Sequence, residues 1–139
     1  MDVTITTDNL KNAIKKEISR FAATAYSEDG SSLYDAYRTT SRDDSTIGNY
    51  INLAVDAIVA RLSNIATASD NNITFNAPDV DSSNKAIERE VANFITMKSC
   101  SLWLEEKGAV EFNKYEARAT SALNAINILV KTRKAPTRS

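Results

Sequence analysis

Few residues of this 139-residue chain could perform acid, base or nucleophilic chemistry, because it has no histidine and a single cysteine, Cys100. A cysteine nucleophile needs a base or a cationic neighbour to form its thiolate. Zinc sites need several histidine and cysteine ligands together. Cys100 falls within the most apolar helical segment of the sequence, so we predict that it is a packed core thiol.

One stretch, residues 79–90, has the oxygen spacing of a calcium-binding loop. Asp79, Asp81 and Ser83 occupy positions 1, 3 and 5, and Glu90 occupies position 12, as in loops of the EF-hand type. Position 6, where the sharp turn requires glycine, is Asn84. An extended segment also precedes the loop where an entering helix should stand. We therefore interpret these residues as helix caps and expect no metal ion, with calcium as the alternative.

Paired carboxylates and phosphate-binding loops are two further kinds of site that could support catalysis. Glu105 with Glu106, and Asp43 with Asp44, are neighbours in sequence, and adjacent residues on a helix point apart. The three glycines stand isolated, whereas phosphate cradles need glycine-rich loops. We therefore expect no enzyme, no catalytic residue, no cofactor and no small-molecule substrate.

The composition predicts one ordinary globular domain. Hydrophobic residues make up 42% of the chain, charged residues make up 25%, and the net charge is −1. So small a charge argues against attraction of the whole surface to nucleic acid or to an anionic membrane. No apolar run approaches the roughly 20 residues that span a bilayer, and the start lacks the pattern of a signal peptide. We expect a soluble protein with no membrane contact.

Apolar residues recur at intervals of three and four along most of the chain, which predicts amphipathic helices. The third of these is apolar over so much of its circumference that it should be central, and Gly108 should end it. The short turn at Gly108 then predicts an antiparallel hairpin of the last two helices. We expect an all-α bundle of four main helices, over residues 8–26, 45–68, 82–107 and 109–131.

Between the first two predicted helices, the polar composition of residues 28–45 predicts a loop with one helical turn around 33–37. Residues 73–76 alternate apolar and polar side chains, which predicts a short extended or β segment. A strand this short needs a partner, either Val3–Ile5 or a neighbouring molecule. Ile73 and Phe75 are therefore candidate subunit contacts. Asp43 and Asp44, in the acidic middle of the chain, are further candidates, because an acidic middle and a basic end would be complementary between copies.

The C-terminal end is basic, with no acidic residue after Glu116. Three interpretations stay open: cations that favour the end of the last helix, an arm that docks on an acidic partner, or contacts with nucleic acid phosphates. We divide the chain into a helical domain, residues 1–133, and a basic tail, residues 134–139. The candidate docking residues are Lys131, Arg133, Lys134, Pro136 and Arg138.

The order of these segments resembles the head-tail connector proteins, also called neck or adaptor proteins, of tailed bacteriophages. The resemblance covers an early helix, an Asp-capped helix that carries Tyr50-Ile51-Asn-Leu53-Ala54, and the extended piece Ile73–Phe75. It continues through the predicted hairpin, from Phe94 past Gly108, to the basic end.

This resemblance implies a structural virion protein that forms a ring-like homo-oligomer and joins the portal to the tail. It further implies that the basic end docks on the portal or on other neck and tail proteins, and that DNA passes through the ring without specific recognition. The protein would be made in the host cytoplasm and located in the virion neck. The alternative function is a small helical regulatory or nucleic-acid-binding module that uses the basic C-terminus.

Overall fold

The structure is a computed structural model that describes residues 2–69, 71–76 and 85–131. Most of the chain is helical, as predicted. Among the residues described, no helix combines the length and the apolar character needed to cross a membrane. The elements in chain order are β1 (Asp2–Thr4), α1 (Thr7–Thr24), α2 (Tyr34–Tyr37), a 3-10 turn (Ser41–Asp43), α3 (Asp44–Arg61), β2 (Ala66–Ser69), β3 (Asn72–Phe75), α4 (Lys85–Glu106) and α5 (Phe112–Lys131).

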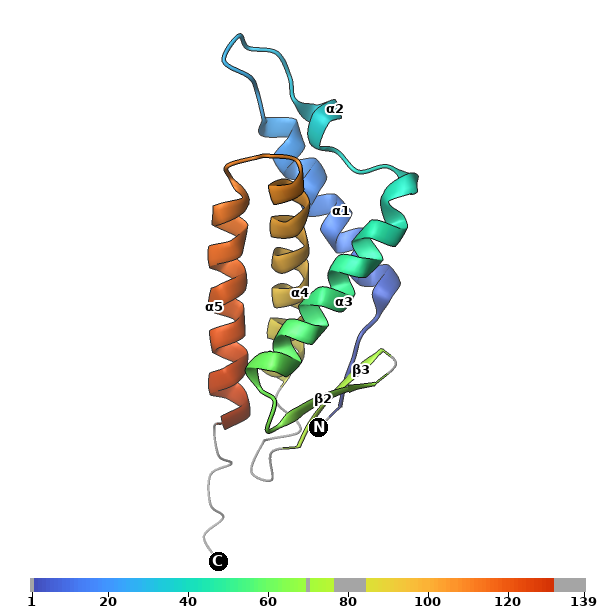
Figure 1. Ribbon diagram of the computed structural model, residues 1–139, viewed down its shortest axis with the longest axis vertical. Helices are drawn as coiled ribbons and strands as arrows, with labels where there is room; N and C mark the ends of the chain where they lie inside the picture. The colour runs from blue at the N-terminus through green and yellow to red at the C-terminus, as the bar shows by residue number, and fades with distance from the viewer. Residues whose placement is uncertain (1, 70, 77–84, 132–139) are drawn as a thin grey trace, which may run out of the picture.

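Helix α4 lies at the centre of the fold and packs against α1, α3 and α5 (Figure 1). Its buried side chains occur on several sides of the helix, which explains why its sequence is apolar over so much of its circumference. Helix α1 buries one stripe of apolar residues, and α3 buries a similar stripe. The buried residues of α4 are Ile87, Val91, Phe94, Ile95, Ser99, Cys100, Ser101, Trp103 and Leu104.

The turn after α4 depends on Gly108, whose φ of 76° lies in the left-handed region. The amide of Gly108 donates to the carbonyl of Glu105 over 3.0 Å, and the amide of Ala109 donates to the carbonyl of Leu104 over 2.9 Å. These two bonds form a Schellman motif, which satisfies carbonyls at the end of the helix. The chain then returns along α4 as α5 (Figure 1).

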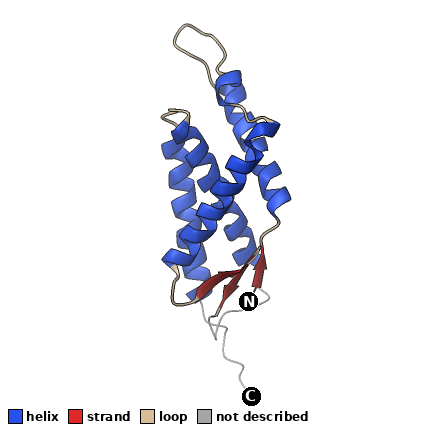
Figure 2. Ribbon diagram, turned by 45° about the vertical axis from the view of Figure 1, so that its right-hand side comes forward, coloured by secondary structure: helices blue, strands red, loops and turns tan. Residues whose placement is uncertain are grey.

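The described residues also form a small antiparallel sheet with the strand order β1-β3-β2. It lies at one end of the helices (Figure 2). Val3 pairs with Ile73, and Ala68 pairs with Ile73 from the other side. Of the two partners that the sequence left open for the extended segment, the structure therefore contains the one near the start of the chain. The sheet is a larger β element than the sequence predicted.

The predicted second helix was wrong at its C-terminal end. We expected it to reach Ala68, but α3 ends at Arg61 and residues 62–65 form a turn. The amides of Ile65 and Ala66 both donate to the carbonyl of Leu62, which closes the turn. Residues 66–69 then pair with β3. The apolar spacing of Leu62 and Ile65 continued the helical period, but strand pairing determined the local structure.

Candidate functional site

The single cysteine occupies the core, as predicted. Cys100 is 0% exposed, and its Sγ lies 3.9 Å from the backbone carbonyl of Ile14. Burial raises the pKa of the Cys100 thiol to about 12, and the charge of Glu17 adds to this rise. The thiolate is therefore scarce at neutral pH, so Cys100 is not activated as a nucleophile.

Asp43 and Asp44, which we expected as candidate subunit contacts, both have partners within the chain. Asp43 accepts hydrogen bonds from the amide of Thr40 over 2.7 Å and from its hydroxyl over 3.2 Å. Asp44 forms an ion pair with Lys15 of α1, and the hydrogen bond from Lys15 lowers the pKa of the Asp44 carboxyl. These acids hold the start of α3 in place, so a contact with another subunit would be a second role for them.

Ile73 and Phe75, the other two candidate subunit contacts, are 0% and 1% exposed. Their side chains belong to the core cluster of this chain, because β3 is the middle strand and this face of it lies against the helices. A contact between subunits through this strand would have to use other atoms.

Only Lys131 of the five candidate docking residues falls within the described part of the chain. It is exposed at the end of α5. Lys131 borders a shallow pocket of about 210 Å³ together with residues 61–65 at the end of α3 and in the following turn. The other four candidates, Arg133, Lys134, Pro136 and Arg138, lie outside the described residues, as do residues 79–84 of the calcium-like stretch.

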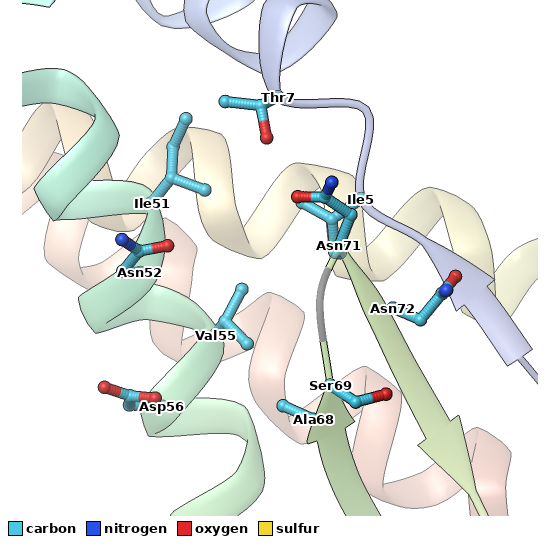
Figure 3. Close-up of a pocket in the computed structure, with 10 residues that line it drawn as sticks. All are labelled: Ile5, Thr7, Ile51, Asn52, Val55, Asp56, Ala68, Ser69, Asn71 and Asn72. Atoms are coloured by element: carbon cyan, nitrogen blue, oxygen red, sulfur yellow. The ribbon is translucent and has the colours of Figure 1, made fainter. Parts of the chain in front are cut away.

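A pocket of about 370 Å³ lies between α3 and the β2–β3 hairpin (Figure 3). Figure 3 shows side chains of α3 on one side, the hairpin on the other, and Ile5 and Thr7 at one end. Ile5, Ile51, Val55 and Ala68 supply apolar surface. The polar lining residues are Thr7, Asn52, Asp56, Ser69, Asn71 and Asn72.

The chemistry of this pocket is hydrogen bonding. Side-chain amides both donate and accept hydrogen bonds, whereas among the described lining residues Asp56 is the only acidic or basic one. The described part of the lining therefore offers no acid-base pair. Sequence reasoning missed this pocket because it missed β2. The signal was the turn sequence Ser69-Asp-Asn-Asn72, with Asn71 in the left-handed conformation at φ 54°.

A second hollow, of about 520 Å³, lies along α4 and α5. We call it the α4–α5 groove. Alanine and serine side chains of α5 and Met97 of α4 line it, and Glu90 and Arg118 add one charge of each sign. Within the part of the chain that the structure describes, no group of His, Cys, Asp and Glu side chains is placed to hold a metal ion.

Comparison of the chain with protein-family models, with curated proteins and with solved structures gives no match.

Proposed function

We propose that this chain is the structural subunit of a head-tail connector of a tailed bacteriophage, and that it forms an oligomeric ring between portal and tail. The observation that carries the proposal is the α4–α5 groove, because ring assembly requires a lateral surface on which a neighbour can pack. The resemblance of the segment order to connector proteins supplies the class of assembly.

The α4–α5 groove suits a helix of a neighbouring subunit. Ala117, Ser121 and Ala125 are spaced by four residues along α5, so they lie in one row on the groove wall. Small side chains let a second helix approach closely. Met97 adds an adaptable apolar surface opposite this row.

The proposed occupant of the groove is α3 of the next subunit, through Leu53. This side chain is 53% exposed, and it does not line the pocket between α3 and the hairpin. The groove and Leu53 are different surfaces, so the contact is heterologous. Heterologous contacts close into rings when the rotation between subunits permits it.

In this proposal the basic end is the contact with the portal, through Lys131, Arg133, Lys134, Pro136 and Arg138. The four cations among these residues would pair with an acidic partner surface. The bundle supplies the rigid wall of the ring, and DNA passes through its lumen unread. The working location is the virion neck.

The experiment compares the oligomeric state of the native chain with that of Leu53→Asp by native mass spectrometry and negative-stain electron microscopy. A charge at position 53 should dissociate the rings. Val110→Asp is the matched control, because Val110 is 75% exposed and lies in the turn between α4 and α5, outside the groove lining. A monomeric native chain that binds DNA in a salt-dependent manner, and loses that binding without residues 131–139, would favour the nucleic-acid-binding alternative.

A further inference from the structure

Helix α3 carries an apolar and an acidic side chain next to each other on its outer face. Leu53 is 53% exposed, and Asp56, three residues further along, is also exposed. Residues at this spacing are neighbours on a helix surface, with their Cβ atoms about 5–6 Å apart. Asp56 forms no ion pair with any residue that the structure describes. The outer face of α3 therefore offers one apolar side chain and one carboxylate to a partner.

The α4–α5 groove carries a complementary pair at the same spacing. Arg118 and Ser121 line it from α5, three residues apart. The small side chains of Ala122 and Ala125 continue this wall. The guanidinium carbon of Arg118 lies 5.6 Å from the centroid of the Tyr115 ring, a cation–π contact that holds the charge at the wall. Within the described part of the chain, Arg118 has no ion-pair partner. The wall therefore matches a helix that carries an apolar residue three positions from an acid.

The two ends of the groove carry opposite charges. Lys98 of α4 donates to Glu116 of α5 over 2.9 Å, which fixes the register of these antiparallel helices (Figure 1). Glu90 precedes Lys98 by about two helical turns, and Ala125 follows Glu116 by a similar distance. Glu90 therefore lies at the Ala125 end of the groove, whereas Arg118 lies at the other end.

These charges distinguish the two directions in which α3 of a neighbouring subunit could lie in the groove. In either direction, Leu53 can pack against Ser121. An α3 that runs antiparallel to α5 then places Asp56 beside Arg118. An α3 that runs parallel to α5 would place Asp56 at the Glu90 end, where like charges repel. Charge complementarity therefore selects the antiparallel direction.

We propose that Asp56 of one subunit forms an ion pair with Arg118 of the next, with α3 of the first subunit antiparallel to α5 of the second. This inference rests on the ring proposed above, and it adds the residues that set the register and direction of the contact. The same register places Asn49 of α3 opposite Ala125.

The polar groups at the far end of the contact agree with this direction. The side-chain amide of Asn49 can donate a hydrogen bond to Glu90 there, so the carboxylate does not face another acid. Charges at the rim of an interface contribute more to the choice of partner and orientation than to affinity. Leu53 in the groove supplies the apolar contact, and the ion pair determines which way the helix lies.

The first test reverses the two charges and measures assembly by native mass spectrometry. Asp56→Arg and Arg118→Asp each place like charges at every contact, so each variant alone should need about tenfold or more protein to assemble. An equimolar mixture of the two variants should assemble again, because each contact between unlike chains joins an arginine to an aspartate. Lys16→Asp, which reverses an exposed cation of α1 outside the groove lining, is the control and should assemble as the native chain does.

The mixture separates the ion pair from a loss of folding, because unfolded chains would not assemble when mixed. The double variant Asp56→Arg with Arg118→Asp should assemble as well. Native rings that survive either single reversal would overturn the ion pair and leave the ring proposal standing. The same holds if neither the mixture nor the double variant restores assembly. A native chain that forms no ring would overturn both proposals.

The second test determines the direction of α3 by disulfide crosslinking. Cys100 is buried, so the introduced thiols are the ones that react. Asn49→Cys combined with Ala125→Cys should link neighbouring subunits covalently in oxidised glutathione. Ala60→Cys combined with Ala125→Cys is the matched control, because Ala60 is also exposed on α3 but lies about 16 Å along the helix from Asn49. Crosslinking of the control pair, or of neither pair in assembled rings, would overturn the proposed direction.

Discussion

The indole Nε1 of Trp103 donates a hydrogen bond to the backbone carbonyl of Tyr37 over 2.7 Å. This bond connects the short helix α2 to the central helix α4. The ring of Tyr37 also lies 5.6 Å from that of Phe21 in α1. A four-residue helix has too few internal hydrogen bonds to be stable alone. Contacts with α1 and α4 therefore hold α2 in place.

Replacing the indole tests this connection. Trp103→Phe keeps an aromatic ring at a position that is 3% exposed, but it removes the donor to Tyr37. We expect a loss of about 1–3 kcal/mol in the free energy of unfolding, measured with urea. Amide exchange at residues 34–38 should accelerate more than exchange in α5. Equal acceleration in both regions would contradict the proposed connection.

Two buried serines of α4 should respond to alanine in opposite directions. Ser101 donates a hydrogen bond to Glu116 over 2.8 Å, so Ser101→Ala should lower the free energy of unfolding by about 1–2 kcal/mol. The hydroxyl of Ser99 has no hydrogen-bond partner among the described residues. Ser99→Ala should leave stability unchanged or raise it by up to about 1 kcal/mol. Urea denaturation of both variants measures the difference, and a clear loss for Ser99→Ala would show that its hydroxyl has a partner.

Two glycines form a second pair with opposite expectations. Gly108 has a φ of 76°, so Gly108→Ala should cost about 1–2 kcal/mol although nothing lies within 4 Å of the added Cβ. Gly48 lies inside α3, where an added Cβ would meet the Cε of Lys11 at 3.6 Å, an ordinary contact. Gly48→Ala should therefore stabilise the protein by about 0.5–1 kcal/mol. Thermal unfolding of the two variants measures both changes in stability. A change of the same sign in both variants would contradict these expectations.

The buried thiol predicts a loss of stability at alkaline pH. Burial raises the pKa of Cys100 from 9.0 to about 12, so the folded state retains a proton that the unfolded state releases. The stabilisation that the protonated thiol gives to the folded state is fully present below pH 9. It is lost as the pH rises toward 12. The free energy of unfolding of Cys100→Ala should fall less steeply between pH 9 and 11 than that of the native chain. Identical slopes would show that Cys100 titrates alike in both states.

The slope in Cys100→Ala should be reduced and not abolished. Tyr115 is also affected mainly by burial, which raises its pKa to about 12. Tyr115→Phe is therefore the matched variant, and combining the two substitutions should reduce the slope further. In urea titrations at each pH, the two effects should not add fully, because the charge of Cys100 is one of the causes that raise the pKa of Tyr115.

Much of the helical fold was predictable from sequence because α1, α3 and α5 each bury a regular apolar stripe, while α4 is apolar over much of its circumference. The stop at Gly108 was predictable for a local reason, since glycine accepts a left-handed conformation. The end of α3 was not, because Leu62 and Ile65 fit a helical period as well as they fit the observed turn. Pairing of residues 66–69 with β3 is a tertiary contact, and no local pattern contains it.

The candidate site residues divide in the same way. The sequence correctly predicted that Cys100 is a core thiol, since its neighbours on a helix are apolar. The ion pair between Asp44 and Lys15 was not predictable from sequence. These residues are far apart in the chain and meet only because α1 packs near α3. The pocket beside β2 was missed for the same reason, since its lining comes from three separate segments.

The mass of the purified native chain, determined by native mass spectrometry and accompanied by electron microscopy, tests the proposed ring most directly. We predict closed rings of a single stoichiometry, which Leu53→Asp dissociates to folded monomers and Val110→Asp leaves intact. A native chain that stays monomeric at all accessible concentrations, with and without a portal preparation, would contradict the connector proposal.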